Sequence, residues 1–277
     1  MEDFKSFEFA CEGFPARRVF YKGSGPGVVL MHELSGMVPE CVDLGRRIAA
    51  AGFTVYVPLL FGEPDEAFSV PKTLGWVAQI CISQEFYCFA KGQTSPITQW
   101  LRALCRRVHN NCGGPGVGVI GMCLTGGFVL SLMADESVIA PVASQPSLPI
   151  GITAAHRQAL GLSAEALAAA KARSQSGVPL LALRFSEDRT SPPERFATLR
   201  REFGDTPEVV RDDAVMCWRR GPALETIEIN SGADNPFHIS RGAHPVLTLE
   251  MRETGHPTRE ALERVLEFLR QQCGQQP

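Results

Sequence analysis

The sequence predicts an α/β protein with a mostly parallel central sheet and helices packed on both of its faces. Short apolar runs rich in β-branched residues alternate with longer amphipathic segments through most of the 277 residues. This alternation is typical of parallel strands joined by crossover helices. The chain contains no internal repeat and no low-complexity linker. We therefore expect one domain over residues 1–277.

The individual elements follow from this pattern in order. Pro39 can begin a helix whose apolar residues recur at helical spacing, and Gly52 can end it. Residues 66–95 have poor periodicity, and we expect a cap or an extended loop over the sheet there. Strands are expected at residues 28–31, 53–57, 117–120, 138–143, 180–183 and 226–229, and helices from Pro39, at residues 97–108 and 163–174, from near Pro192, and at residues 257–269.

A cysteine stands where a buried strand is expected to turn sharply into a helix. Gly121 precedes Cys123 by two residues, and Gly126 follows it by three. Slim residues near these positions let the backbone pass close to neighbouring chain, as the strand–nucleophile–helix turn of hydrolases requires. A helix starting here would aim its free N–H groups at the sulfur and favour the thiolate. The spacing alone fits a buried, unreactive cysteine equally well.

A thiol nucleophile requires a base, and the base requires a group that orients it. In hydrolases with such a turn, the chain order is nucleophile, acid, histidine. Asp188 follows the strand expected at residues 180–183, and it is the preferred acid, with Glu187 in reserve. Asp188 could instead cap the next helix, although Ser191 could also do so.

Two histidines compete for the role of base. His238 and His244 both lie in the glycine-containing connection that follows the strand expected at residues 226–229. His256 comes immediately before the last helix, and we expect it in a capping position. The residues by themselves leave the choice between His238 and His244 open.

The loop after the first expected strand supplies further candidates. Hydrolases of this kind form an oxyanion hole from one N–H of this loop and from the N–H of the residue after the nucleophile. Leu34 and Leu124 occupy these two positions. Glu33 would then be a carboxylate beside the nucleophile, with the thiol or an arginine as partner. The alternative is a solvated loop glutamate.

The composition limits compartment and partners. The net charge is −3, no run of about 18 apolar residues occurs and the N-terminus opens with mixed charges, so we expect a cytoplasmic protein outside the membrane. Nine cysteines without a C-x-x-C pair fit reduced thiols better than a disulfide framework or a zinc site. Arg102, Arg106 and Arg107 recur at helical spacing, which favours a solvated helix face over a nucleic-acid surface.

Together these motifs resemble the dienelactone hydrolase family, which are cysteine hydrolases on an α/β-hydrolase scaffold. The resemblance covers roughly residues 28–269. It is carried by residues 32–36 with 43–53, by residues 121–124, and by Asp188 with the prolines and Glu194-Arg195 after it. The resemblance implies that Cys123 is the nucleophile and Asp188 the acid. It also implies that Glu33 holds the thiol until substrate displaces it.

The chain departs from the family pattern at two positions. Thr125 stands where the family has glycine, so the elbow must tolerate a β-branched residue or move its close contact to Gly126. Asn235 stands where the family's Gly-x-x-His-x-Phe passage has its catalytic histidine. An Ala-His-x-Val-Leu-Thr passage, which we associate with a divergent branch, contains His244. We therefore prefer His244 over His238 as the base.

The predicted function is hydrolysis of a small-molecule ester or lactone, without a cofactor or a metal ion. Cys123 would attack the carbonyl, and His244, oriented by Asp188, would activate the thiol and then water. A non-catalytic ligand-binding or regulatory protein is the alternative, which Asn235 keeps open. A glutamine amidotransferase would need a late His-x-Glu, and a cysteine-dependent phosphatase would need Arg six residues after the cysteine; the chain has neither.

Overall fold

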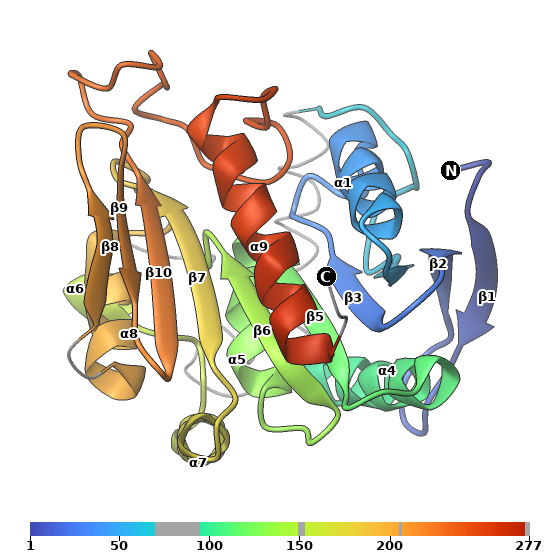
Figure 1. Ribbon diagram of the computed structural model, residues 1–277. Coiled ribbons are helices and arrows are strands. Elements are labelled where there is room, and N and C mark those ends of the chain that lie inside the picture. The colour runs from blue at the N-terminus through green and yellow to red at the C-terminus, as the bar shows by residue number, and fades with distance from the viewer. Residues whose placement is uncertain (70–94, 149–152, 205–206, 275–277) are drawn as a thin grey trace.

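The structure, a computed structural model, describes residues 1–69, 95–148, 153–204 and 207–274, and the strands of these ranges form one sheet (Figure 1). The strand order is β1-β2-β4-β3-β5-β6-β7-β10-β9-β8. The strands are β1 (Lys5–Phe9), β2 (Arg17–Gly23), β3 (Gly27–Met31), β4 (Thr54–Pro58), β5 (Val117–Met122), β6 (Val138–Ser144), β7 (Leu180–Phe185), β8 (Glu208–Asp212), β9 (Met216–Arg220) and β10 (Leu224–Ile229). The helices are α1 (Pro39–Ala50), α4 (Ile97–Cys112), the 3-10 helix η2 (Cys123–Gly127), α5 (Phe128–Leu132), α6 (Ala154–Gln158), α7 (Ala164–Gln175), α8 (Pro193–Phe203) and α9 (Pro257–Cys273).

Six neighbouring strands in the middle of the sheet, from β4 to β10, run parallel. Every residue of β3, β4, β5 and β7 is buried. Strands covered on both faces need no polar side, and this explains their unbroken apolar runs. All six expected strands are present, and the predicted α/β fold is confirmed.

The edges of the sheet are antiparallel and were not expected from the sequence. Strands β1 and β2 pair at one edge, and β8 and β9 at the other. Four of the five residues of β8 are exposed, so its sequence lacks the apolar run that marks the inner strands. Exposed edge strands give a weak periodic signal, which is why the sequence did not predict them.

Helices cover both faces of the sheet, and alternate strand residues face the two layers. Val28 and Leu30 of β3 belong to a core that includes α1 and α9, which lie on the near side of the sheet in Figure 1. Val29 and Met31 belong to a second core, with α4, α5 and α8. This two-residue alternation is the normal period of a strand. The parallel centre is therefore a rigid platform for residues at the strand ends.

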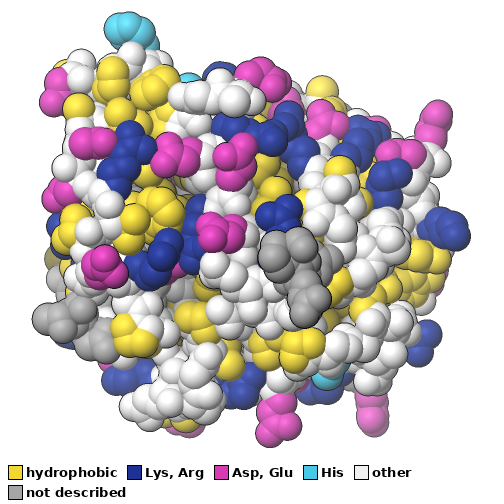
Figure 2. All heavy atoms as spheres, in the orientation of Figure 1, with side chains coloured by type: hydrophobic (Ala, Val, Ile, Leu, Met, Phe, Trp, Pro, Cys, Tyr) yellow, Lys and Arg dark blue, Asp and Glu magenta, His cyan; other side chains and the backbone are white. Residues whose placement is uncertain are grey.

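Charged side chains of both signs are interspersed over the face shown in Figure 2. Some of them join elements, as between Arg211 of β8 and Glu260 of α9. Arg106 and Arg107 lie exposed on α4, as expected for a solvated helix face, whereas Arg102 is half-buried and donates to the Ser131 carbonyl. Within the described ranges, no helix combines the length and apolar character needed to cross a membrane. The cap or loop expected at residues 66–95 falls almost entirely outside the described residues.

Candidate active site

The predicted site residues follow the carboxyl ends of neighbouring parallel strands. Glu33 comes shortly after β3, Cys123 directly after β5 and Asp188 shortly after β7, while His244 lies in the long connection after β10. Parallel strands present these ends at one edge of the sheet, where open α/β sheets bind their ligands. Segments that are far apart in the sequence therefore meet in one place.

Cys123 lies at a sharp turn with an unusual backbone conformation. Its φ is +57°, in the left-handed region that side chains other than glycine rarely adopt. A β-carbon at Gly121 would overlap the Thr125 carbonyl, and one at Gly126 would lie 2.9 Å from the Ser144 carbonyl oxygen. The expected close contact at Gly126 is confirmed. A helix follows Cys123, as expected, and it begins as the 3-10 helix η2 and continues as α5.

The Thr125 side chain has a structural task in this turn. Its hydroxyl accepts a hydrogen bond from the Met122 N–H at 2.9 Å. It also lies within donating distance of three carbonyls, those of Met122 at 2.9 Å, Met31 at 3.1 Å and His32 at 3.2 Å. The β-branched residue that departs from the family pattern therefore ties the elbow to the end of β3.

The Cys123 thiol is buried and contacts a hydroxyl that the sequence did not single out. Its Sγ lies 3.1 Å from the Ser147 Oγ, and the Ser147 N–H donates to the Cys123 carbonyl at 2.9 Å. Ser147 follows β6, the neighbour of β5 in the sheet. A search for polar residues after the strand next to the elbow would have found it.

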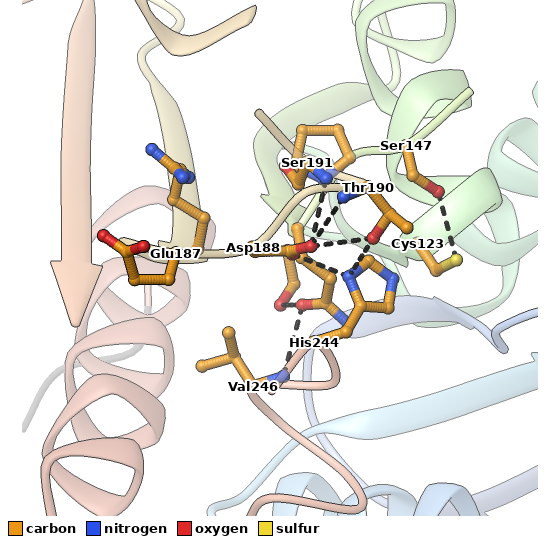
Figure 3. Close-up of polar contacts among 12 residues, drawn as sticks. Cys123, Ser147, Glu187, Asp188, Thr190, Ser191, His244 and Val246 are labelled. Atoms are coloured by element: carbon orange, nitrogen blue, oxygen red, sulfur yellow. Dashed lines mark hydrogen bonds and ion pairs between the residues drawn. The ribbon is translucent and has the colours of Figure 1, made fainter. Parts of the chain in front are cut away.

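Buried Asp188 pairs with partly buried His244 (Figure 3). Asp188 Oδ2 lies 2.6 Å from His244 Nδ1, and Oδ1 accepts from the Thr190 hydroxyl and from the N–H groups of Thr190 and Ser191. Burial acts to raise the pKa of Asp188, but the hydrogen bonds from His244 and Thr190 outweigh it and lower the pKa. Asp188 thus orders its own loop and holds the imidazole.

The second ring nitrogen of His244 faces Cys123 in Figure 3. This Nε2 atom is buried and has no hydrogen-bond partner among the described residues. Burial acts to lower the pKa of His244, but the charge of Cys123 and the hydrogen bond and charge of Asp188 raise it well above the ordinary value. The imidazole is therefore oriented by Asp188 on one side and directed toward the thiol on the other.

The other candidates from the sequence lie elsewhere. His238 is exposed, and the Glu187 side chain points away from His244 in Figure 3. Asn235 closes its own loop, because its side chain bonds the Gly232 carbonyl and both backbone groups of Ile239. His256 caps α9 by accepting from the Thr258 N–H, as expected. The structure thus brings His244, and not His238, to Asp188.

Glu33 is buried in a hydrogen-bond network that joins three segments. Its Oε1 accepts from Gln145 Nε2 at 2.9 Å and from the Thr248 hydroxyl at 2.8 Å. Gln145 in turn accepts from the Ser144 hydroxyl and from the Val246 N–H. Burial raises the pKa of Glu33, and the charge of His244 and the two donors offset this only in part. The hydrogen bonds of Glu33 thus go to the scaffold, while the thiol bonds Ser147.

The two amides expected in the oxyanion hole lie at the predicted places in the chain. Leu34 occupies the second position of a turn that the Gly36 N–H closes onto the Glu33 carbonyl at 2.9 Å. That hydrogen bond does not use the Leu34 amide. Leu124 follows Cys123 at the start of η2, where N–H groups of a helix are not used by the helix itself.

A buried arginine links two of these loops. Arg195 donates to the carbonyls of Pro146, at 2.9 Å, and of Thr190, at 3.0 Å, and it also bonds those of His156 and Ala159. Burial lowers its pKa to about 10, which leaves it charged at neutral pH. Arg195 thereby fixes the loop of Asp188 against that of Ser147. The sequence resemblance included Arg195 but indicated no role for it.

The described part of the chain holds no group of three or more His, Cys, Asp or Glu side chains that could bind a metal ion. The seven cysteines within the described ranges are free, in agreement with the expected reduced thiols.

A cysteine with a strained backbone lies after a central parallel strand, and an aspartate and a histidine that follow it in the chain meet beside it, an arrangement and chain order typical of α/β-hydrolases. Solved structures share the fold. A putative dienelactone hydrolase from Klebsiella pneumoniae has 15% identity and a TM-score of 0.55, with 99% of both chains covered. DcsB, in complex with its substrate analogue, has 14% identity and a TM-score of 0.60, with 98% of this chain and 99% of that chain covered. The dienelactone hydrolase-like promiscuous phosphotriesterase P91, from metagenomic libraries, has 14% identity and a TM-score of 0.57, with 96% and 98% covered.

The model of the dienelactone hydrolase family matches residues 14–166, which is more than half of the chain. The protein belongs to the dienelactone hydrolase family, and the resemblance seen in its motifs is confirmed. It is therefore a hydrolase that acts on ester bonds of small molecules. No curated protein matches the sequence.

Proposed function

We propose that the protein hydrolyses a carboxylic ester or lactone through a Cys123–His244–Asp188 triad and an acyl-enzyme intermediate. One observation carries the proposal. His244 holds Asp188 through Nδ1 at 2.6 Å, while its buried, unpartnered Nε2 faces Cys123. Buried polar atoms are nearly always paired, so an unpaired one in such a place fits an atom that exchanges a proton during reaction.

The steps follow from these positions. Cys123 gives its proton to His244 and forms a C–S bond with the substrate carbonyl carbon. The N–H groups of Leu34 and Leu124 hold the oxyanion. When the intermediate collapses, the C–O bond breaks and the leaving alcohol takes the proton from His244. Water then attacks the thioester, gives one proton to His244, and the acid leaves as that proton returns to the sulfur.

The site also accounts for the departures from the family pattern. Thr125 is accommodated by its bonds to the end of β3, and His244 reaches the acid in place of the residue at position 235. Asn235, the residue on which a non-catalytic alternative depended, has its own task in its loop. These contacts favour the enzyme over a ligand-binding protein.

The test is the Cys123→Ala variant assayed with p-nitrophenyl acetate. We expect hydrolysis to fall on the order of 10⁶-fold, as when a triad nucleophile is removed. Cys217→Ala, at a partly exposed thiol of β9, is the matched control and should retain the wild-type rate. Mass spectrometry of wild-type enzyme quenched during turnover should show one acetyl group on the peptide that contains Cys123. Wild-type turnover by Cys123→Ala would refute the proposal.

A further inference from the structure

The peptide bond between Glu33 and Leu34 is held in one orientation. The Glu33 carbonyl lies 2.9 Å from His32 Nδ1 and accepts from the Gly36 N–H at 2.9 Å. The C=O and N–H of a trans peptide point in opposite directions because the unit is planar. Two hydrogen bonds on the Glu33 carbonyl therefore fix the direction of the Leu34 N–H as well.

The His32 ring can donate to that carbonyl because its other nitrogen is occupied. Its Nε2 lies 3.1 Å from the Leu60 N, and since an amide N–H can only donate, Nε2 must accept and carries no proton. The proton of the neutral ring is then on Nδ1, next to the Glu33 oxygen. Burial lowers the pKa of His32 to about 4, so the ring stays neutral at physiological pH. The ring is fully buried and packs edge-on against Phe61.

Thr125 ties this loop to the elbow. Its hydroxyl lies 3.1 Å from the Met31 carbonyl and 3.2 Å from the His32 carbonyl, just before the Glu33–Leu34 peptide. The Met122 carbonyl of the elbow, at 2.9 Å, shares the single hydroxyl proton with them. Thr125 itself directly follows Leu124. One buried side chain thus bridges the two backbone segments that carry the Leu34 and Leu124 amides.

We infer that His32 and Thr125 are positioning residues, which preset the two oxyanion-hole amides before substrate binds. His32 sets the direction of the Leu34 N–H, and Thr125 sets the spacing between the front loop and the elbow. The inference rests on the proposed function, because it assigns these residues to the oxyanion hole of the same site. Preorganised donors stabilise developing charge without reorganisation during the reaction, which is why small displacements reduce the rate.

The first test compares Thr125→Val with Thr125→Ser. Valine keeps the shape and removes the hydroxyl, whereas serine keeps the hydroxyl. We expect Thr125→Val to lower kcat for p-nitrophenyl acetate about tenfold or more, with KM within about threefold, and Thr125→Ser to recover most of the loss. Alkylation of Cys123 by iodoacetamide should proceed at the wild-type rate in both variants, because substitution at a saturated carbon forms no oxyanion.

The second test compares His32→Asn with His32→Gln. An asparagine amide reaches the place of Nδ1 and can donate to the Glu33 carbonyl. A glutamine amide reaches the place of Nε2 and can accept from the Leu60 N–H, but it does not reach the Glu33 carbonyl. Asparagine should therefore retain more of kcat than glutamine, again with unchanged alkylation.

Each outcome decides the inference. A wild-type kcat in Thr125→Val, or alkylation that falls in parallel with kcat, overturns it, since the hydroxyl would then be dispensable or would act on the thiol. If Cys123→Ala is inactive while Thr125→Val is fully active, only the inference fails. If Cys123→Ala remains active, the proposed function itself fails.

Discussion

Two buried carboxyl groups near His244 have surroundings that move their pKa values in opposite directions. Asp188 receives four hydrogen bonds over both oxygens, one of them from His244. Glu33 receives its bonds from Gln145 and Thr248 on a single oxygen. The pKa of Asp188 is lowered in spite of burial, whereas burial raises that of Glu33.

The difference separates an orienting acid from a scaffold acid. Where the surroundings shift the pKa values of two carboxyl groups in opposite directions, the two groups can take different roles. Asp188 is kept ionised and supports the imidazolium form of His244. Glu33, whose pKa burial raises, joins the front loop to two other connections, through Gln145 and Thr248. The resemblance implied that Glu33 holds the thiol, and this remains a prediction that the same comparison can test.

The largest effect is expected from Asp188→Asn. The amide can present its N–H to His244 and select the wrong tautomer, so kcat should fall by about 10⁴-fold, as for the equivalent change in other triads. The pKa of His244, which Asp188 helps to raise in the wild type, should fall in the variant. The imidazolium is then lost at a lower pH, so the alkaline limb of the kcat/KM profile should move to lower pH. Steady-state kinetics from pH 5 to 10 would check both.

Glu187→Gln is the matched control for that change, because the Glu187 side chain points away from His244. It should leave the rate and the pH profile as in the wild type. Equal losses in the two variants would mean that the loop, and not the Asp188 carboxylate, sets the rate.

Glu33→Gln should have a much smaller effect on activity. The glutamine oxygen can accept from both Gln145 and Thr248, so kcat should stay within about tenfold of the wild type. Because the folded protein binds the Glu33 proton more tightly than the unfolded chain, Glu33 makes wild-type stability fall as pH rises from about 4.3 through the raised pKa. That fall should be smaller in Glu33→Gln, as urea unfolding between pH 4 and 8 would show.

A loss of activity in Glu33→Gln as large as in Asp188→Asn would contradict the scaffold role. It would mean that the reaction requires the charge of Glu33, as the family resemblance implies.

Effects of tenfold or less are expected from a pair of threonine changes. Thr190→Val and Thr248→Val each remove one hydroxyl that donates a hydrogen bond to a buried carboxyl group. Each change should lower the free energy of unfolding by about 1–3 kcal/mol. Thr190→Val should also lower kcat by roughly tenfold, because the Thr190 hydroxyl lies 2.7 Å from both Asp188 Oδ1 and His244 Nδ1. Thr248→Val should leave kcat within about threefold. An equal kcat in the two variants would contradict the assignment of different roles to Asp188 and Glu33.

Burial explains how far the fold could be predicted from the sequence. The parallel strands are covered on both faces, so each is an apolar run that local pattern reveals. The edge strand β8 is exposed and carries Glu208, Arg211 and Asp212, so its pairing depends on neighbours that no local window contains. The helix after Cys123 was expected, but its 3-10 start follows from the close contact at Gly126, which only the folded chain creates.

The candidate site divides in a similar way. Cys123 and Asp188 could be selected because their chain order and strand-end positions are constrained by chemistry. Gln145 could not, since a neutral polar residue in a loop is common and carries no motif, and nothing in the passage that contains Thr248 indicated that its hydroxyl would bond Glu33. Their positions depend on contacts across the sheet, such as that between Gln145 and Glu33, which are separated by 112 residues.

The backbone conformation of Cys123 affects how a substitution at this position would change the stability of the protein. A residue with a β-carbon at φ +57° costs roughly 1–3 kcal/mol, a cost that glycine would not incur. In a lineage no longer selected for activity, replacement of Cys123 by glycine would therefore gain stability at once. Cys123 therefore occupies this turn at a backbone cost, as a nucleophile at such a turn does.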